Sequence, residues 1–152
     1  MSIPLYDKSI VLFKRMTDRG MPKVPSQSYE GEDAGWDLYL SRTVSIPPGQ
    51  FMDLHTDVSV AMPKGVWGRI TGRSSTLRKY GLLVQEGIID NGYRDELCIG
   101  AWNLNRDEEI VLQTGTRIAQ IIFHPIIPVV WHPVQELPGS KRGKGGFGST
   151  GR

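Results

Sequence analysis

Short runs of β-branched and aromatic residues, separated by Gly, Pro, Asp and Asn, recur along most of this chain. Helical periodicity is nearly absent. Runs of this composition between turn-forming residues are typical of short strands. The sequence therefore predicts an all-β fold, with strands over residues 9–14, 56–61, 65–71, 96–103, 109–112, 119–123 and 129–131.

Turn signals separate these runs. Ile46-Pro47-Pro48-Gly49 and Met62-Pro63-Lys64-Gly65 predict turns, because proline presets φ and the following glycine tolerates a positive φ. Strands that follow one another so closely indicate a sandwich or jelly roll. A single short helix is predicted over residues 76–80, with Ser74 or Ser75 as its cap and Gly81 ending it in the left-handed conformation.

The composition is that of a folded domain. The chain has 152 residues, 39% of them hydrophobic and 22% charged, with a formal net charge of +2, which suits one compact domain. No apolar run approaches the roughly 18 to 20 residues that cross a bilayer, and no signal segment begins the chain, so we expect a cytoplasmic protein of cellular or viral origin. Charges of both signs are scattered, which does not indicate a nucleic-acid partner.

The cysteine and the histidines carry no recognisable signature. Cys98 is the only cysteine, which excludes an internal disulfide, and we expect it to be a buried core thiol. Three histidines, His55, His124 and His132, are isolated in the sequence and lack the spacing of metal ligands. We therefore predict no functional role for them.

The chain changes character after Pro138. Residues 139–152 hold six glycines and one large apolar residue, Phe147. We therefore expect a core domain over residues 1–138 and a flexible arm over residues 139–152. The segment from Gly143 to Gly148 matches the G-x-G-x-x-G fingerprint, but the chain ends four residues later, which leaves no room for the helix that a dinucleotide site requires.

Two segments suggest phosphate chemistry. Gly72-Arg73-Ser74-Ser75 precedes the predicted helix, so a guanidinium, two hydroxyls and free backbone N–H groups would converge there; the alternative is an ordinary serine cap beside a solvated arginine. Asp90-Asn91-Gly92 predicts a hairpin with Asp90 at its tip, where the carboxylate either forms the turn or acts as a base.

Two further segments offer polar groups on strands. Asp37, at the start of an expected strand, could hold a metal-bound water or close a turn. Arg117 and Gln120 are three residues apart on another predicted strand. That spacing places their side chains on opposite faces, so only one of them could meet a ligand.

In their order along the chain, five segments resemble the five motifs of the trimeric dUTPase family: AGWDL, GRSSTLRKYGL, GIIDNGYRDEL, GTRIAQIIF and RGKGGFGSTG. The resemblance implies a jelly-roll-like (β-clip) subunit and a homotrimer with active sites at subunit interfaces, each covered by the arm of another subunit. It implies hydrolysis of dUTP to dUMP and pyrophosphate with Mg²⁺.

The resemblance also implies residue roles. Asp90 matches the carboxylate that activates the attacking water, Tyr93 the aromatic residue on deoxyribose, and Phe147 the ring over uracil. Asp37 matches an acidic residue near the hydrated magnesium ion. The remaining matches bind phosphate or read uracil: Arg73, Ser74, Ser75, Gln120, Arg142, Gly148, Ser149 and Thr150 in the first group, and Gln85, Gly87, Ile88 and Ile89 in the second.

The mechanism implied is phosphoryl transfer to water. Mg²⁺, Arg73, Arg142 and the helix N-terminus would offset the charge of the triphosphate, while ionised Asp90 takes a proton from the water that attacks the α-phosphorus. Pyrophosphate then leaves.

The chain departs from the family pattern at three positions. The family commonly has proline where Gly72 stands, and glycine where Ser75 and Asp95 stand. Two alternative functions are weighed. A dCTP deaminase-like enzyme would use a glutamate where this chain has Gly100, and a non-catalytic nucleotide-binding regulatory trimer would not need Asp90 or the arm.

Overall fold

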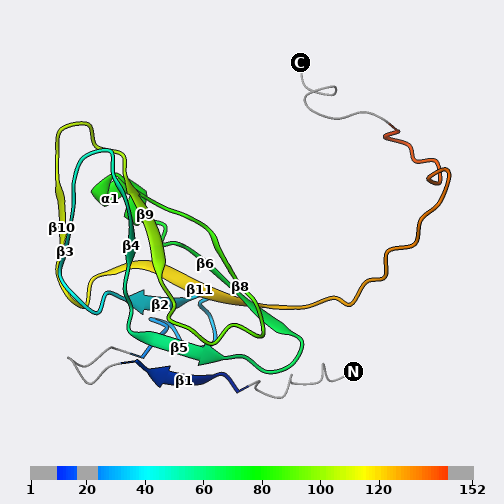
Figure 1. The fold of residues 1–152 in the computed structure, drawn as a ribbon, viewed down its shortest axis with the longest axis horizontal. Helices are drawn as coiled ribbons and strands as arrows, with labels where there is room; N and C mark the ends of the chain where they lie inside the picture. The colour runs from blue at the N-terminus through cyan, green and yellow to red at the C-terminus, as the bar shows by residue number, and fades with distance from the viewer. Residues whose placement is uncertain (1–9, 17–23, 144–152) are drawn as a thin grey trace.

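The computed structural model describes residues 10–16 and 24–143 and shows a mostly β fold with one short helix in those residues (Figure 1), which confirms the predicted fold class. No helix in the described residues has the length and apolar character to span a membrane. The elements are β1 (Leu12–Arg15), β2 (Trp36–Tyr39), β3 (Val44–Ile46), β4 (Phe51–Leu54), β5 (Val58–Ala61), β6 (Val66–Gly72), α1 (Thr76–Tyr80), β7 (Leu82–Val84), β8 (Gly87–Ile89), β9 (Ile99–Asn103), β10 (Ile110–Leu112) and β11 (Arg117–Pro125).

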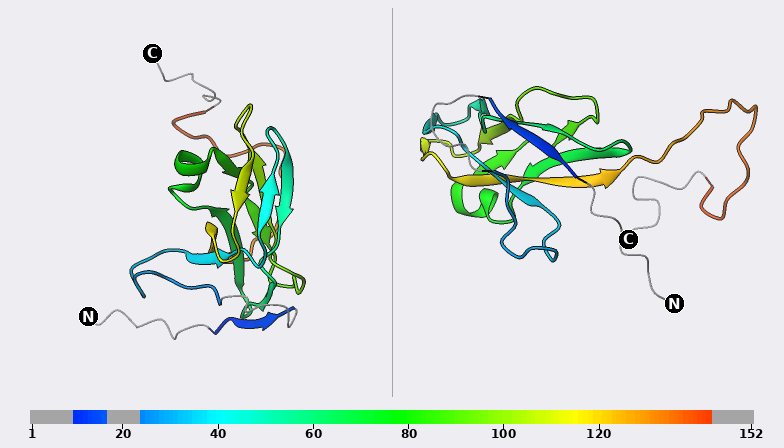
Figure 2. Two further views of the ribbon diagram at one scale, coloured as in Figure 1. Left: turned by 90° about the vertical axis from the view of Figure 1, so that its left-hand side faces the viewer. Right: turned by 90° about the horizontal axis from the view of Figure 1, so that it is seen from below.

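The strands form four antiparallel sheets around one core. The larger sheets have the orders β2-β11-β6-β8 and β4-β9-β7, and the pairs β1-β5 and β10-β3 complete the arrangement (Figures 1 and 2). Both larger sheets contribute to one apolar cluster, with Leu38 and Ile121 from the first and Leu54 and Ile99 from the second, each at most 2% exposed. Full burial of such a side chain contributes about 1.5–3 kcal/mol.

Strand β11 organises the first sheet, because it pairs with β2 on one side and β6 on the other. Gln120 pairs with Asp37 and Arg117 with Tyr39, and a bulge lies between Arg117 and Ala119. The bulge adds one residue to β11, so Arg117 and Gln120 both share the face of Asp37. The expectation that they lie on opposite faces is therefore wrong.

Helix α1 has the predicted bounds and is held against β11. The Thr76 hydroxyl donates a hydrogen bond to the Ile118 carbonyl at 2.6 Å. Gly81 ends the helix at a φ of 66°, as expected. Ser75 is the N-cap residue, but its side chain makes no capping hydrogen bond, so the serine cap itself is not formed.

The connections between strands partly match expectation. Both Pro-Gly turns are confirmed, with Gly49 at a φ of 68° and Gly65 at 81°. The turn at Asp90 is also confirmed, since the Tyr93 N–H donates to the Asp90 carbonyl at 3.0 Å. The predicted hairpin is wrong, however: β8 pairs with β6, whereas β9 pairs with β4 and β7.

After Pro125 the chain leaves the body of the molecule (Figure 1 and the right view of Figure 2). The strand predicted over residues 129–131 is absent from this described segment, and Val130 and Trp131 are 93% and 94% exposed. Their composition suits a strand, but a strand needs a partner edge, and this segment lies away from every edge of its own chain. Strands β3, β4 and β7 were not predicted from the sequence, and each has only three or four residues, a length at which alternation is a weak signal.

Candidate functional site

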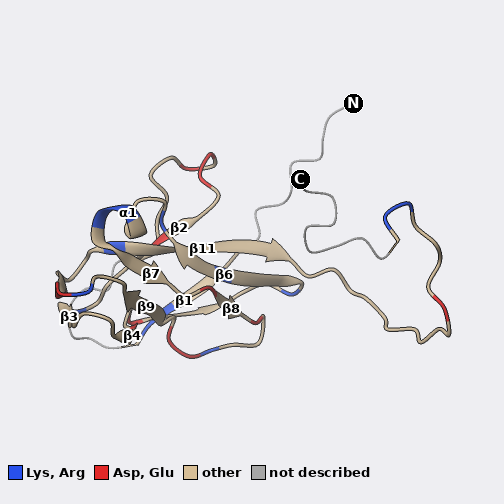
Figure 3. Cartoon of the chain, turned by 90° about the horizontal axis from the view of Figure 1, so that it is seen from above, with Lys and Arg blue, Asp and Glu red and all other residues tan. Residues whose placement is uncertain are grey.

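Several predicted site residues gather in a cavity of about 310 Å³ beside the start of α1, which we call the Asp37 cavity. Strand β2 supplies Asp37, β11 supplies Gln120, and the segment between β6 and α1 supplies Arg73 and Ser74. The acidic loop that leads into β2 lies on the same side of the sheet as α1 (Figure 3), and residues of this loop line one side of the cavity.

Asp37 holds two arginines on one face of the sheet. Its Oδ1 lies 2.8 Å from Arg73 Nε, and its Oδ2 lies 3.0 Å from Arg117 Nη1. The carboxylate is only 11% exposed, so water screens these ion pairs weakly. The Arg117 guanidinium also lies over the Tyr39 ring, 5.9 Å from its centre. Two cations are thus held in fixed positions beside a polar cavity, an arrangement suited to a polyanion.

Gln120 lies against the backbone of Gly35. A Cβ at position 35 would come within 2.2 Å of Gln120 Oε1, so any larger residue would force the Gln120 amide to move. The amide nitrogen in turn approaches the Gly72 carbonyl at 3.4 Å. The observed position of the Gln120 side chain therefore depends on the glycine in Ala34-Gly35-Trp36-Asp37-Leu38, which is far away in sequence.

Sequence reasoning missed the loop side of the cavity, which Ser28, Tyr29 and Asp33 line. Asp33 Oδ2 accepts hydrogen bonds from the backbone N–H groups of Ser28 at 2.9 Å and Tyr29 at 2.8 Å. The only local signal was a turn-like composition around Gly31, which predicts a loop but not what the loop covers.

A second group of predicted residues surrounds the turn after β8. Asp90 is exposed, and the Tyr93 hydroxyl donates a hydrogen bond to the Glu96 carbonyl at 2.9 Å. Burial, followed by the charges of Asp95, Cys98 and Glu96, raises the pKa of Tyr93, so its hydroxyl stays protonated. Gln85 donates its N–H to the Gly100 carbonyl at 2.8 Å, beside β8.

The structure does not bring these two groups together within one chain. Ile89 pairs with Gly68 of β6, and Arg73 follows Gly68 by five residues. At a rise of about 3.3 Å per residue, Arg73 lies about 17 Å along the β6 direction from the level of Ile89, and Asp90 lies one residue beyond.

The remaining site residues are distributed as follows. Ser75 follows Ser74 at the exposed start of α1, and Arg142 is exposed in the segment beyond β11. The positions expected to cover the base and bind phosphate from the arm, Phe147, Gly148, Ser149 and Thr150, lie outside the described residues.

Known proteins resemble the chain over most of its length. The family model described as dUTPase matches residues 22–151. The deoxyuridine 5'-triphosphate nucleotidohydrolase of Cutibacterium acnes is 37% identical over 121 residues, which cover 78% of this chain and 80% of the relative. The enzyme of the same name from Paramecium bursaria Chlorella virus 1 is 36% identical over 143 residues, which cover 94% and 99%.

Solved structures give the same relationship. The dUTPase of Staphylococcus bacteriophage 80alpha, in complex with dUPNHPP, superimposes with a TM-score of 0.86 at 28% identity, covering 94% of this chain and 99% of that one. The dUTPase of phage phi11 of S. aureus, whose structure describes the coordination of a structural Mg(II) ion, shares the fold with a TM-score of 0.77 at 23% identity.

Proposed function

The chain belongs to the dUTPase family and hydrolyses dUTP to dUMP and pyrophosphate, and from this premise we propose that it works as a homotrimer whose active sites combine residues of different subunits. The Asp37 cavity of one subunit would bind the phosphates. The turn at Asp90 of a second would hold the nucleoside and the attacking water, and an arm over residues 139–152 would close the site.

The separation of Arg73 from Asp90 carries this proposal. Each directly follows a strand of the same sheet, yet the β6–β8 register leaves about 17 Å between Arg73 and the level of Ile89, and Asp90 lies one residue beyond. The water attacks the α-phosphorus, which sits next to the nucleoside, while Arg73 must neutralise the same short triphosphate. If the segment at Arg73 of one subunit lies against the turn at Asp90 of another, both residues can reach one substrate.

The segment after β11 also supports the proposed homotrimer. Ile127, Val130 and Trp131 are more than three-quarters exposed in the single chain. Exposed apolar residues in such a run mark a surface that another protein surface covers. A neighbouring subunit would cover them and would direct the following arm toward a shared site.

Asp90 is proposed as the general base. As an ionised carboxylate in the turn after β8, it takes one proton from a water molecule while the water oxygen forms a bond to the α-phosphorus. The bond from that phosphorus to the bridging oxygen breaks, and pyrophosphate leaves with the bonding electrons. Arg73, Ser74, Ser75 and Gln120 bind the phosphate oxygens, joined by Arg142, Ser149 and Thr150 from the arm.

The donor set beside Asp37 fits a hydrated Mg²⁺ ion. Each Asp37 oxygen already accepts from a guanidinium, which disfavours direct coordination but leaves lone pairs for metal-bound water. Mg²⁺ usually keeps several waters and binds through few carboxylates and the substrate phosphates. When bound, it supplies charge neutralisation to the triphosphate and orients the leaving group.

Base selection is proposed to use β8 and its surroundings. Strand β8 stands at the edge of its sheet in the described residues, so one side of the backbone at Gly87, Ile88 and Ile89 remains open to pair with uracil. Gln85 lies beside it, and Phe147 of an arm would cover the ring. Tyr93, held through its hydroxyl, would pack on deoxyribose and exclude a ribose 2′-hydroxyl.

Deamination is disfavoured by the packing at Gly100. A Cβ there would come within 2.8 Å of Phe51 Cζ and 2.9 Å of Gln85 Oε1. The glutamate that the deaminase-like alternative needs would therefore displace two neighbours.

One experiment tests the proposed function against both alternatives. Each deoxynucleoside triphosphate is supplied with Mg²⁺, and pyrophosphate and ammonia are measured. We expect pyrophosphate from dUTP alone, and little of it when Mg²⁺ is chelated. Ammonia from dCTP would instead identify a deaminase, and the absence of both products would identify a binding protein.

A further inference from the structure

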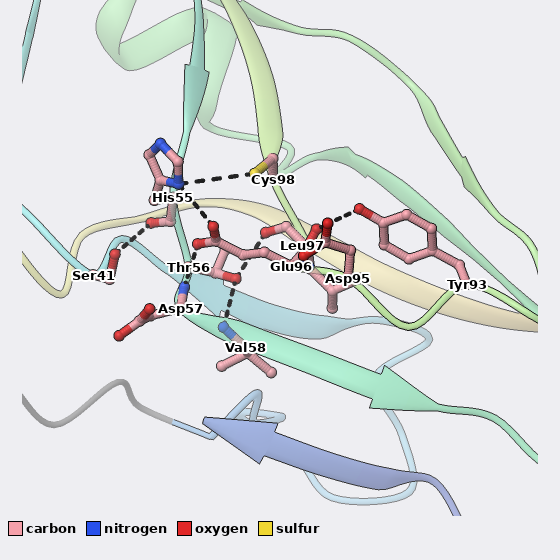
Figure 4. A network of polar contacts seen from close by, with 10 residues as sticks. All are labelled: Ser41, His55, Thr56, Asp57, Val58, Tyr93, Asp95, Glu96, Leu97 and Cys98. Carbon is pink, nitrogen blue, oxygen red and sulfur yellow. Dashed lines mark hydrogen bonds and ion pairs between the residues drawn. The ribbon is translucent and has the colours of Figure 1, made fainter. Parts of the chain in front are cut away.

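Three metal-ligating side chains meet near the start of β9: His55, Glu96 and Cys98, which we call the His55 cluster (Figure 4). His55 Nδ1 lies 2.8 Å from Glu96 Oε2 and 3.9 Å from Cys98 Sγ. One ligand atom from each residue lies within 4.8 Å of the other two. Glu96 lies within the GIIDNGYRDEL segment but has no role in the proposed reaction, whereas His55 and Cys98 lie outside the five dUTPase-like segments. Sequence reasoning assigned no metal site to these three side chains.

The backbone holds the His55 cluster together. Leu54 pairs with Ile99 across the antiparallel strands β4 and β9. His55 follows Leu54 and Cys98 precedes Ile99, so these two residues are opposite each other. Glu96 precedes Cys98 by two residues, in a tight turn in which the Cys98 N–H donates to the Glu96 carbonyl at 3.0 Å, and its carboxylate reaches His55. The Thr56 hydroxyl donates to the Leu97 carbonyl at 2.7 Å and ties the two segments together between the ligands.

Neighbouring groups orient the ligands. Asp57 has a φ of 62°, in the left-handed region, and its N–H donates to Glu96 Oε1 at 2.7 Å. That bond directs the other oxygen of Glu96 toward His55. The His55 carbonyl accepts from the N–H of Ser41 at 2.9 Å and from its hydroxyl at 3.1 Å. Supporting contacts of this kind orient ligands in protein metal sites.

The His55 cluster includes one carboxylate that is largely shielded from solvent, since the Glu96 side chain is 17% exposed. A carboxylate in such a position favours a bound cation over an anion.

We propose that the His55 cluster binds a Zn²⁺ ion through His55 Nδ1, one oxygen of Glu96 and Cys98 Sγ, with water as the fourth ligand. Tetrahedral zinc with bonds of about 2.0–2.1 Å to nitrogen and oxygen and 2.3 Å to sulfur sets N···S near about 3.6 Å and N···O near about 3.4 Å. The observed 3.9 and 2.8 Å require shifts of only about half an ångström. Binding releases the thiol proton to solvent as the sulfur–zinc bond forms, and the proton that His55 Nδ1 donates to Glu96 leaves Nδ1 for Nε2 or for solvent, which frees the lone pair that binds the ion.

The ligand types select the metal class. Nitrogen, sulfur and one carboxylate oxygen suit zinc, whereas Mg²⁺ prefers oxygen ligands throughout. The ion would join the segment after β4 to the segment that anchors Tyr93, whose hydroxyl donates to the Glu96 carbonyl. This site is separate from the magnesium requirement of dUTP hydrolysis and does not depend on it.

Metal titration of the full chain, prepared without a histidine tag and stripped with a chelator, tests the proposal. We expect one Zn²⁺ per chain and a higher Tm in the presence of the ion. Co²⁺ in the same site should give the visible absorption of a four-coordinate ion together with a thiolate charge-transfer band near the ultraviolet. Substoichiometric Zn²⁺ binding, or a Co²⁺ spectrum without the thiolate band, would overturn the proposal.

Single variants assign the ligands. Cys98→Ser should abolish the charge-transfer band, and Cys98→Ser and His55→Gln should each weaken Zn²⁺ binding at least tenfold. His132→Gln, an exposed histidine in the segment beyond β11, is the matched control and should bind as the unaltered chain does. Equal affinity in all three variants would refute the assignment. If a variant fails to fold, the Co²⁺ spectrum of the unaltered chain still decides between thiolate coordination and its absence.

Discussion

At the residue scale, Gly35 constrains Gln120 in the cavity that we propose binds the phosphates. Gln120 pairs with Asp37 across β2 and β11, and its amide occupies the space where a Cβ of residue 35 would stand. The small residue before Trp36 therefore sets the position of a side chain proposed to bind phosphate. Asp37 acts similarly on Arg73 and Arg117 by accepting from both guanidinium groups.

The substitution Gly35→Ala should destabilise the protein by about 1–3 kcal/mol, because the added methyl group overpacks against Gln120. Urea denaturation at one protein concentration measures the loss. In a Gln120→Ala background the same substitution should cost less, since the clashing amide is gone. An equal loss of unfolding free energy in both backgrounds would mean that the methyl group clashes with a residue other than Gln120.

Asp90→Asn should leave the fold intact and reduce turnover of dUTP by about 10² to 10⁴, the range that a positioned general base supplies. Pyrophosphate release measures turnover, and circular dichroism checks the fold. Asp107→Asn alters another exposed aspartate, in the loop between β9 and β10, and should change turnover little. Near-normal turnover of Asp90→Asn would remove Asp90 from the mechanism.

At the scale of elements, the contact between α1 and β11 positions the segment that we propose binds phosphate. Arg73 donates its N–H to the Ile118 carbonyl at 3.1 Å, and the Thr76 hydroxyl donates to the same oxygen. The helix has only five residues, so tertiary contacts rather than helix propensity must hold it. The bulge in β11 acts at the same scale, since it turns Arg117 toward Asp37.

Thr76→Val should destabilise the protein by about 0.5–1.5 kcal/mol, the net value of one buried hydrogen bond, while preserving side-chain shape. Thr76 is 2% exposed, so water cannot replace the lost bond. Thr114→Val, at an exposed turn, is the matched control and should change stability less. Chemical denaturation compares the two, and equal effects would argue against a specific anchor at Thr76.

At the scale of the whole molecule, the chain beyond Pro125 has two different proposed tasks. Residues 126–137 present apolar side chains that their own chain leaves uncovered, whereas residues 139–152 are glycine-rich and carry Arg142 and Phe147. The first part is suited to joining subunits. The second is suited to closing a site.

Two truncations separate these tasks. A chain that ends at Ser140 should remain trimeric but lose most of its dUTP turnover, because it lacks the arm residues proposed to contact substrate. A chain that ends at Pro125 should also lose the trimer. Analytical ultracentrifugation measures the assembly and pyrophosphate release the turnover. A trimer that survives removal of residues 126–152 would show that other surfaces hold the subunits together.

Local sequence patterns predicted several features correctly. The fold class followed from composition and turn spacing, the end of α1 from Gly81, and the two Pro-Gly turns from φ preferences, whereas the predicted serine cap of α1 is not formed. The order of five short motifs identified the family, which the family model confirms. These features succeeded because each depends on residues only a few positions apart.

The tertiary structure decided whatever depends on strand pairing across long sequence distances. The bulge moved Arg117 to the face of Asp37, β8 paired with β6 rather than β9, and Cys98, expected in the core, is only partly buried and lies beside His55. Propensity and periodicity act within a strand, whereas register depends on which distant strand satisfies its hydrogen bonds and covers its apolar face. For that reason the sequence by itself determined the kind of elements and the family of this protein, and only the folded chain determined which side chains meet.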